Sequence, residues 1–397
     1  MRFKLYLLTV FMFFLSNMIP LQTTRFYLIP LGIIAVLLSP NSRVLKHDYF
    51  GYYGWMLTWM IFILMSAVWA ISPKLSIYTL VANVIPIFLL TYSLTKYITC
   101  YERLNNILCI LYVSSLIMLV YLFLFVDLEM VVGQRISKAF TDEGLAETWN
   151  ANSIGMNLAM SVFCGFSIVK HYNNKLLFVV WSLISLVMIF VIMLTGSRKA
   201  LLVLVIPIAI IAMYDLKKRF LWAVMLLLIG VGIFYMAMTV PFFYDIIGNR
   251  IEDLYNILTG NDDGTEDSSR KILIEYGLKW FQDSPIIGYG MNCFRVLSDK
   301  TSYFAGKNFY AHNNFIEILV GGGLIGFFIF YSYTIKLYRR IKGHREYTYR
   351  YVLAILCMTL FLDMALVSYY DVIMQFLIML CFVILNLEKK KYQYEGM

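Results

Sequence analysis

Long apolar runs alternate with short polar stretches along almost the whole chain. Most runs approach the roughly 20 residues that an α-helix needs to cross about 30 Å of hydrocarbon, where a helix satisfies its own backbone hydrogen bonds. The pattern predicts an all-α polytopic membrane protein with about 12 transmembrane helices. The predicted spans are Leu5–Ile19, Phe26–Leu38, Tyr52–Ile71, Leu75–Thr95, Asn105–Val126, Asn152–Val169, Leu176–Leu194, Ala200–Tyr214, Phe220–Phe242, Asn314–Tyr338, Tyr351–Val367 and Val372–Leu387.

The first two spans are short and are separated by Pro20 and the polar run Gln22–Thr24, which predicts a hairpin rather than one long helix. Arg2 and Lys4 precede the first apolar run, as they would in a signal peptide. No small-residue cleavage site follows and further spans come at once, so we expect an uncleaved membrane anchor.

Composition and charge agree with this class. Hydrophobic residues make up 61% of the chain and charged residues 14%, whereas a soluble domain carries about 25% charged residues. With the N-terminus inside, 20 of the 33 Lys and Arg residues fall on the inner side. The short outer loops hold only Arg25, Lys74, Arg198 and Lys199, which predicts that both termini are cytoplasmic. The net charge of +9 therefore reflects topology and does not indicate nucleic-acid binding.

The spans divide the chain into three parts: residues 1–242 with spans 1–9, residues 243–311 as an extracytoplasmic loop domain, and residues 312–397 with spans 10–12 and a cytoplasmic tail. A second long outer loop is predicted at Asp127–Ala151. Of the six cysteines only Cys293 falls in an outer loop, so no disulfide framework is expected there.

Within the loop domain, Asn249–Leu258 and Ser268–Gln282 are predicted helices. The acidic turn 261–267 between them lacks the ligand spacing of an EF-hand, so we expect a solvated loop rather than a metal site. Gly288-Tyr289-Gly290 predicts a tight turn back toward the membrane. The apolar face of the second helix is expected to hold Ile272, Leu273, Tyr276 and Trp280.

Two basic positions on the outer side suggest anion binding. Ser197, Arg198 and Lys199 lie in the turn between spans 7 and 8, where two positive charges run against the positive-inside trend. Arg offers a planar fork for phosphate oxygens, although a helix cap with a snorkelling side chain would also explain the turn. Arg270 and Lys271 lie in the first turn of the loop helix, where free N–H groups can receive an anion. Solvated charges are the alternative for that pair.

His312 lies where the loop domain meets span 10 and is the only histidine predicted on the outer side. An imidazole titrates near neutral pH, which suits proton transfer, although such a histidine can also be a satisfied interfacial residue. Asn313 and Glu317 are four apart and share a helix face, whereas Glu317 is five residues from His312 and could partner it only through a bend or a bridging water. The glycines at 321–323 and 326 predict close helix packing or a kink, while the role of Asp363 in span 11 stays open.

Taken together, these residues resemble the O-antigen ligase and O-antigen polymerase family of bacterial envelope enzymes. The motifs that carry the resemblance are Thr-Gly-Ser-Arg at 195–198, Ser269-Arg270 followed by Trp280 and by Pro-Ile-Ile-Gly-Tyr-Gly at 285–290, and Ala-His-Asn-Asn-Phe at 311–315 followed by Glu317 and Gly-Leu-Ile-Gly at 323–326. The resemblance is strongest over residues 190–335, and the first five spans agree in topology only.

The resemblance implies a GT-C-like inverting glycosyltransferase of the inner membrane, with its active site on the outer face and with no metal or cofactor. Its donor would be an oligosaccharide on polyprenyl (undecaprenyl) pyrophosphate, and its acceptor a sugar hydroxyl of a glycan or glycolipid. Arg198 and Arg270 would bind the pyrophosphate and His312 would activate the acceptor, with Ser197, Lys199, Lys271, Asn313 and Glu317 as further substrate contacts. Membrane lipids and a chain-length regulator are the other implied partners.

Two activities fit these motifs: a polymerase that joins repeat units, which we favour, and a ligase that transfers finished polymer to lipid A-core. A lipid-glycan transporter is a third interpretation. Transporters commonly contain internal repeats and place charged residues near the bilayer midplane. This chain has no evident repeat, and its notable polar residues gather at the outer face, so the sequence favours chemistry over transport.

Overall fold

The computed structural model describes residues 1–19, 26–40, 50–126, 150–214, 266–304, 306–344 and 346–395, with scattered positions between 231 and 252. Several predicted elements lie wholly or mostly outside these residues, so they stay predictions. They are the span Phe220–Phe242, the loop helix Asn249–Leu258, the outer loop Asp127–Ala151 and the acidic turn 261–267.

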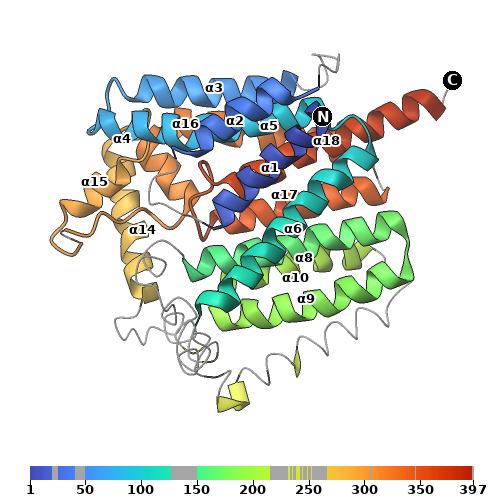
Figure 1. Cartoon of the computed structure of the whole chain (residues 1–397). Coiled ribbons are helices and arrows are strands. Elements are labelled where there is room, and N and C mark those ends of the chain that lie inside the picture. The colour runs from blue at the N-terminus through green and yellow to red at the C-terminus, as the bar shows by residue number, and fades with distance from the viewer. Residues whose placement is uncertain are drawn as a thin grey trace. The chain divides into compact units, whose positions relative to one another are not determined.

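Each of the other predicted spans has a helix at its place (Figure 1). Six helical segments of the described chain are long and apolar enough to cross a membrane, so the protein is a multi-pass membrane protein; a total of twelve spans stays a prediction. The helices are α1 (Arg2–Met18), α2 (Leu28–Leu38), α3 (Phe50–Ser66), α4 (Pro73–Tyr78), η1 (Thr79–Val84), α5 (Ile85–Tyr97), α6 (Tyr101–Phe125), α8 (Ala151–Tyr172), α9 (Lys175–Thr195), α10 (Arg198–Tyr214), α14 (Glu266–Asp283), α15 (Phe294–Asp299), α16 (Asn314–Ile341), α17 (Tyr347–Asp363) and α18 (Val372–Glu395).

Two local predictions are confirmed at this level. The N-terminal apolar stretch forms two separate helices, α1 and α2, rather than one. The loop helix predicted at Ser268–Gln282 is present as α14 and is longer by two residues at its start and one at its end. All six cysteines are free thiols.

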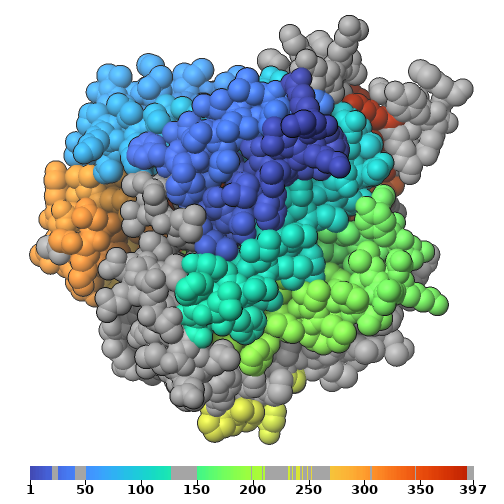
Figure 2. Space-filling view, in the orientation of Figure 1, coloured from blue at the N-terminus to red at the C-terminus, as the bar shows by residue number. Residues whose placement is uncertain are grey.

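The chain forms two compact units. Unit 1 contains Met1–Thr9, Thr24–Cys100 and Gly264–Met397, and unit 2 contains Val10–Thr23 and Tyr101–Asp263. In unit 2, α8 packs against α6, α9 and α10, and Figure 2 shows the teal surface of α6 running beside the green surface of these helices. Most of α9 is exposed and apolar, which suits a helix that faces lipid.

In unit 1, α16 packs against α3, α14 and α17, and α18 packs against α5 and α17. Aromatic rings fill the contact between α3 and α16. Trp59 lies 4.9 Å from Phe330, and Trp55 lies 5.0 Å from Tyr333, measured between ring centroids. The indole N–H of Trp55 also donates to the Phe330 carbonyl at 2.7 Å. Because these groups are buried, the paired N–H avoids the penalty of an unsatisfied donor.

Helix α16 is interrupted at Gly323, whose φ of 59° and ψ of −161° are accessible essentially only to glycine. The predicted turn at residues 288–290 docks against this break. The Tyr289 N–H donates to the Val320 carbonyl at 2.9 Å. The Gly290 N–H donates to the Gly321 carbonyl at 2.8 Å. The turn therefore supplies donors to two carbonyls that the broken helix leaves without their usual partners.

The same turn also supplies acceptors. On the far side of the break, Leu324 N–H donates to the Pro285 carbonyl at 2.8 Å and Ile325 N–H donates to the Ile286 carbonyl at 3.2 Å. A side chain at Gly288 would lie 2.5 Å from a backbone oxygen of α16, so only glycine fits there. The glycine run at 321–323 thus provides the predicted kink, and the kink gives the loop domain a fixed place on α16.

Candidate active site

His312 lies two residues before α16, at the entrance to a candidate membrane span, as the sequence predicted. Its φ of 52° is in the left-handed region, which non-glycine residues seldom adopt. Asn313 caps the helix: its side-chain oxygen accepts from the Ile316 N–H at 3.1 Å. The half-buried imidazole therefore projects from a sharp turn immediately before a capped helix start.

Glu317 holds the backbone beside this histidine. It is fully buried, and its Oε2 accepts a hydrogen bond from the Ala311 N–H at 2.9 Å. Its Oε1 has no hydrogen-bond partner among the described residues. The carboxylate thus reaches the His312 turn through the preceding peptide, a contact that spacing on a regular helix could not reveal because the chain bends there.

Asn314 anchors the other side of the turn. Its side-chain oxygen accepts from the backbone N–H groups of Ser368 and Tyr369, at 3.0 and 3.3 Å. Its amide donates to the Tyr331 hydroxyl at 2.9 Å, and that hydroxyl donates to Asp363 at 3.0 Å. Asp363 is therefore a buried acceptor in a network that joins α16 to the segment after α17.

Arg295, which the sequence analysis did not single out, lies close to His312. Its guanidinium carbon is 5.0 Å from the centre of the Tyr310 ring, and that ring is 4.0 Å from the imidazole ring of His312. In the sequence, the only indication of this residue is a single charge within the apolar run around Phe294. Only the fold shows that this charge and the histidine touch the same ring.

The charge on Arg295 is well supported. Burial lowers the pKa of Arg295, but Tyr370 and Glu317 together outweigh burial and raise that pKa above its ordinary value. Its Nε donates to the side-chain oxygen of Asn292 at 3.2 Å. Burial also raises the pKa of Tyr370 to about 12, so its hydroxyl is neutral near pH 7 and can accept a hydrogen bond from the guanidinium.

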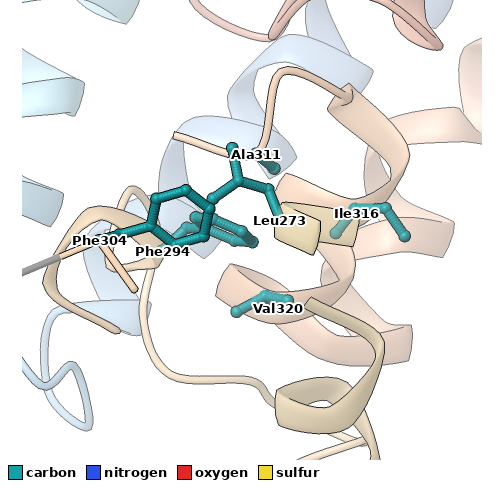
Figure 3. Close-up of a cluster of buried hydrophobic side chains, with 6 residues drawn as sticks. All are labelled: Leu273, Phe294, Phe304, Ala311, Ile316 and Val320. Atoms are coloured by element: carbon teal, nitrogen blue, oxygen red, sulfur yellow. The ribbon is translucent and has the colours of Figure 1, made fainter. Parts of the chain in front are cut away.

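Arg270 lies in the same unit as His312. It is on α14 three residues before Leu273, which belongs to a buried apolar cluster with Ala311, the neighbour of His312. Figure 3 shows this cluster, which also contains Phe294, Phe304, Ile316 and Val320. The predicted apolar face of α14 is confirmed, since Ile272, Tyr276 and Trp280 pack against the cluster.

The cluster explains how α14 is held against α16. Gly277 sits where the two helices cross, and a β-carbon there would lie 2.3 Å from the Ile316 side chain. This contact fixes the helix that carries Arg270, which is partly buried, whereas the neighbouring Lys271 is exposed. The first turn of α14 and the start of α16 therefore belong to one packed region.

The turn that carries Arg198 belongs to unit 2. Gly196 ends α9 with a φ of 58°, and Ser197 and Lys199 are buried at its side. The Ser197 hydroxyl oxygen accepts from the Ala200 N–H at 3.4 Å and so caps α10. The helix cap considered from the sequence is thus present at Ser197, whereas the snorkelling side chain was expected of Arg198. The side chain of Arg198 lies outside the described residues.

The structure therefore brings Arg270, Asn313 and Glu317 into the same unit as His312, and it places Ser197, Arg198 and Lys199 in the other unit. The expectation that both arginines and the histidine share one pocket stays a prediction.

Comparison with known proteins supports the family that the motifs suggested. The profile of the O-antigen ligase family matches residues 183–331, a segment that runs from α9 into α16 and contains every candidate residue. No curated protein matches the chain. Members of this family are membrane glycosyltransferase-like enzymes that act on lipid-linked glycans and lipid acceptors. Over residues 183–331, this multi-pass membrane protein is similar to the O-antigen ligase family.

Proposed function

We propose that the protein is a GT-C-like envelope glycosyltransferase that polymerises oligosaccharide repeat units carried on polyprenyl pyrophosphate. The observation that carries the proposal is the setting of His312, an imidazole on a turn that is anchored at both sides and set at the start of a membrane helix, inside the segment that matches the family profile. We place the reaction on the outer face of the bacterial inner membrane, with both termini in the cytoplasm.

The donor already carries a good leaving group. What it requires is stabilisation of the negative charge that develops on the pyrophosphate as the sugar bond breaks, and guanidinium groups supply this in a site shielded from water. In this proposal Arg198 and Arg270 bind the pyrophosphate, with Ser197, Lys199 and Lys271 as auxiliary contacts. The reaction then needs no divalent metal ion.

The acceptor requires a base. An acceptor hydroxyl attacks the anomeric carbon, its proton passes to the His312 imidazole, and the bond from that carbon to the pyrophosphate oxygen breaks. The products are a longer glycan with an inverted anomeric centre and free polyprenyl pyrophosphate. In this reaction Glu317 and Asn313 act through the backbone, because both hold the turn that carries the histidine.

Turnover of a polyprenyl-pyrophosphate oligosaccharide by the purified protein tests this assignment. We expect Arg198→Ala and Arg270→Ala each to lower the rate by about two to three orders of magnitude, by analogy with the loss of an oxyanion donor. His312→Ala should lower it at least as much, and EDTA should change nothing. Full activity of all three variants would reject the site, and a strict requirement for a divalent ion would reject the mechanism.

A ligase that transfers finished polymer to lipid A-core is the second candidate, favoured by the description of the matched family. Glycans on the lipid carrier in cells separate the two activities. If the protein is a polymerase, cells without the gene hold single repeat units on the carrier and cells with it hold long polymer. Long polymer that accumulates on the carrier without the gene would instead identify a ligase.

A further inference from the structure

The cationic side chain of Arg295 lies near His312, and the proposed reaction assigns no role to it. Arg295 is the second residue of α15, and its guanidinium lies over the Tyr310 ring, which in turn contacts the imidazole. In the described chain the guanidinium forms no ion pair with a carboxylate within 4.0 Å. Structural arginines in apolar surroundings are usually paired, so this one is held for another reason.

The contacts of Arg295 come from several separate parts of unit 1. Asn292 accepts a hydrogen bond from its Nε and itself donates to the Thr79 hydroxyl in η1 at 2.9 Å. Tyr370, which lies between α17 and α18, interacts electrostatically with the guanidinium. Because these partners are tied to different helices, the guanidinium has a fixed position relative to the helices of unit 1 before any substrate binds.

That fixed position acts on the histidine through Tyr310. A cation over an aromatic ring is attracted to it, which restrains the ring. The Tyr310 ring then restrains the imidazole. The two ring centroids are 4.0 Å apart and the ring planes are inclined by 35°, so the rings are in direct contact. The backbone of the turn is held by Glu317 and Asn313, but neither contact orients the imidazole itself.

We propose that Arg295 is a positioning residue that orients the imidazole of His312 through the ring of Tyr310. The proposal rests on the proposed function for its kinetic consequence, because a general base must point at the acceptor hydroxyl. Its structural content is independent of that function. Without Arg295, the Tyr310 ring and the imidazole sample more orientations, and a smaller fraction of them suits proton transfer.

The first test measures orientation without turnover. Diethyl pyrocarbonate modifies accessible neutral imidazoles, and peptide mass spectrometry of the full-length protein gives the rate at each histidine. We expect Arg295→Gln and Tyr310→Leu each to raise the rate at His312 by about two- to fivefold, the equivalent of a cation–π contact at a partly exposed site. The exposed residues His171 and His344 serve as internal controls and should not change.

The second test separates orientation from binding. In steady-state assays with the lipid-linked donor, Arg295→Gln should lower kcat by about tenfold or more and leave KM unchanged. Arg295→Lys, which keeps the charge, should recover part of the loss. The double variant with Tyr310→Leu should be no slower than the slower single variant, because both act on one contact. Lys300→Gln, which removes an exposed charge from the other end of α15, is the matched control.

Several outcomes would overturn the proposal. An unchanged modification rate at His312 in Arg295→Gln would show that the guanidinium does not restrain the imidazole. A raised KM with unchanged kcat would make Arg295 a direct donor contact, and additive losses in the double variant would separate Arg295 from Tyr310. If the wild-type protein does not turn over the donor, the proposed function fails and the modification rates alone decide the role of Arg295.

Discussion

The turn before His312 and the turn before Arg198 both end at the start of an apolar helix, but they are held in different ways. The His312 turn is fixed by residues distant in sequence, since Asn314 reaches the backbone of Ser368 and Tyr369. The Arg198 turn has hydrogen bonds between residues close in sequence, as between Ser197 and Ala200. The hydrogen bonds described for the first turn are thus long-range, and those described for the second turn are local.

The difference shows what each region can tolerate. A turn closed by local hydrogen bonds can form whenever its two helices form, so it depends mainly on its own residues and on the surface beneath it. A turn held by distant partners depends on the whole unit, because every helix that contributes a partner must be in place. Substitutions far from His312 should therefore disturb the His312 region more than comparable changes disturb the Arg198 turn.

The largest expected effect is at the break in α16. Gly323→Ala puts a β-carbon 2.3 Å from the Ile286 carbonyl oxygen at a φ of 59°, so we expect a loss of about 3 kcal/mol or more of stability. Gly306→Ala is the matched control, with a φ of 77° and open space around the new carbon, and should cost about 1 kcal/mol. Thermal unfolding in detergent gives both values, and equal melting temperatures for the two variants would contradict the docking of the turn.

The corresponding change in unit 2 is Gly155→Ala. A β-carbon there would lie 2.8 Å from the Thr195 hydroxyl and 3.3 Å from the Ser197 side chain, so the Arg198 turn must shift. We expect a loss of about 1–3 kcal/mol, as for other overpacked sites. Gly51→Ala in α3 is the control, since its nearest atom would be 3.9 Å away. A loss of stability in Gly155→Ala as large as that in Gly323→Ala would contradict the difference between the two turns.

Two substitutions of Glu317 separate the effect of its hydrogen bond with the Ala311 N–H from the effect of its negative charge. Glu317→Gln keeps an oxygen that can accept from the Ala311 N–H and should retain most activity. Glu317→Ala leaves that buried N–H without a partner, a penalty of about 1–3 kcal/mol, and activity should fall by about tenfold or more. Initial rates with the lipid-linked donor measure the activity of both variants. Equal losses in both variants would show that the charge, not the hydrogen bond, is what matters.

The smallest expected effect is at the cap of α16. Asn313→Ala removes the acceptor for the Ile316 N–H and should lower stability by about 1 kcal/mol. Asn313→Asp keeps the acceptor and should be close to wild type in thermal unfolding. A fall in activity for Asn313→Asp with unchanged stability would instead support direct contact of the Asn313 amide with substrate.

The helices were predictable because apolar runs of this length have few alternatives in lipid, and α14 was predictable from its apolar face around Leu273. The sequence also indicated the kink and the tight turn through their glycines. It could not show that the turn at residues 288–290 docks onto the break at Gly323, or that Arg295 meets His312 through Tyr310. Those contacts join segments whose spacing follows no helical period, so only the folded chain reveals them.

The central claim of the proposed function is that Arg198 and Arg270 each bind the donor pyrophosphate, and the most direct measurement is the Kd of polyprenyl pyrophosphate for the purified protein. Each arginine-to-alanine change should weaken binding by roughly ten- to a hundredfold, the equivalent of a charged hydrogen bond. His312→Ala should leave the Kd within about twofold, because in this account the imidazole serves the acceptor. A wild-type Kd in either arginine variant would contradict this claim.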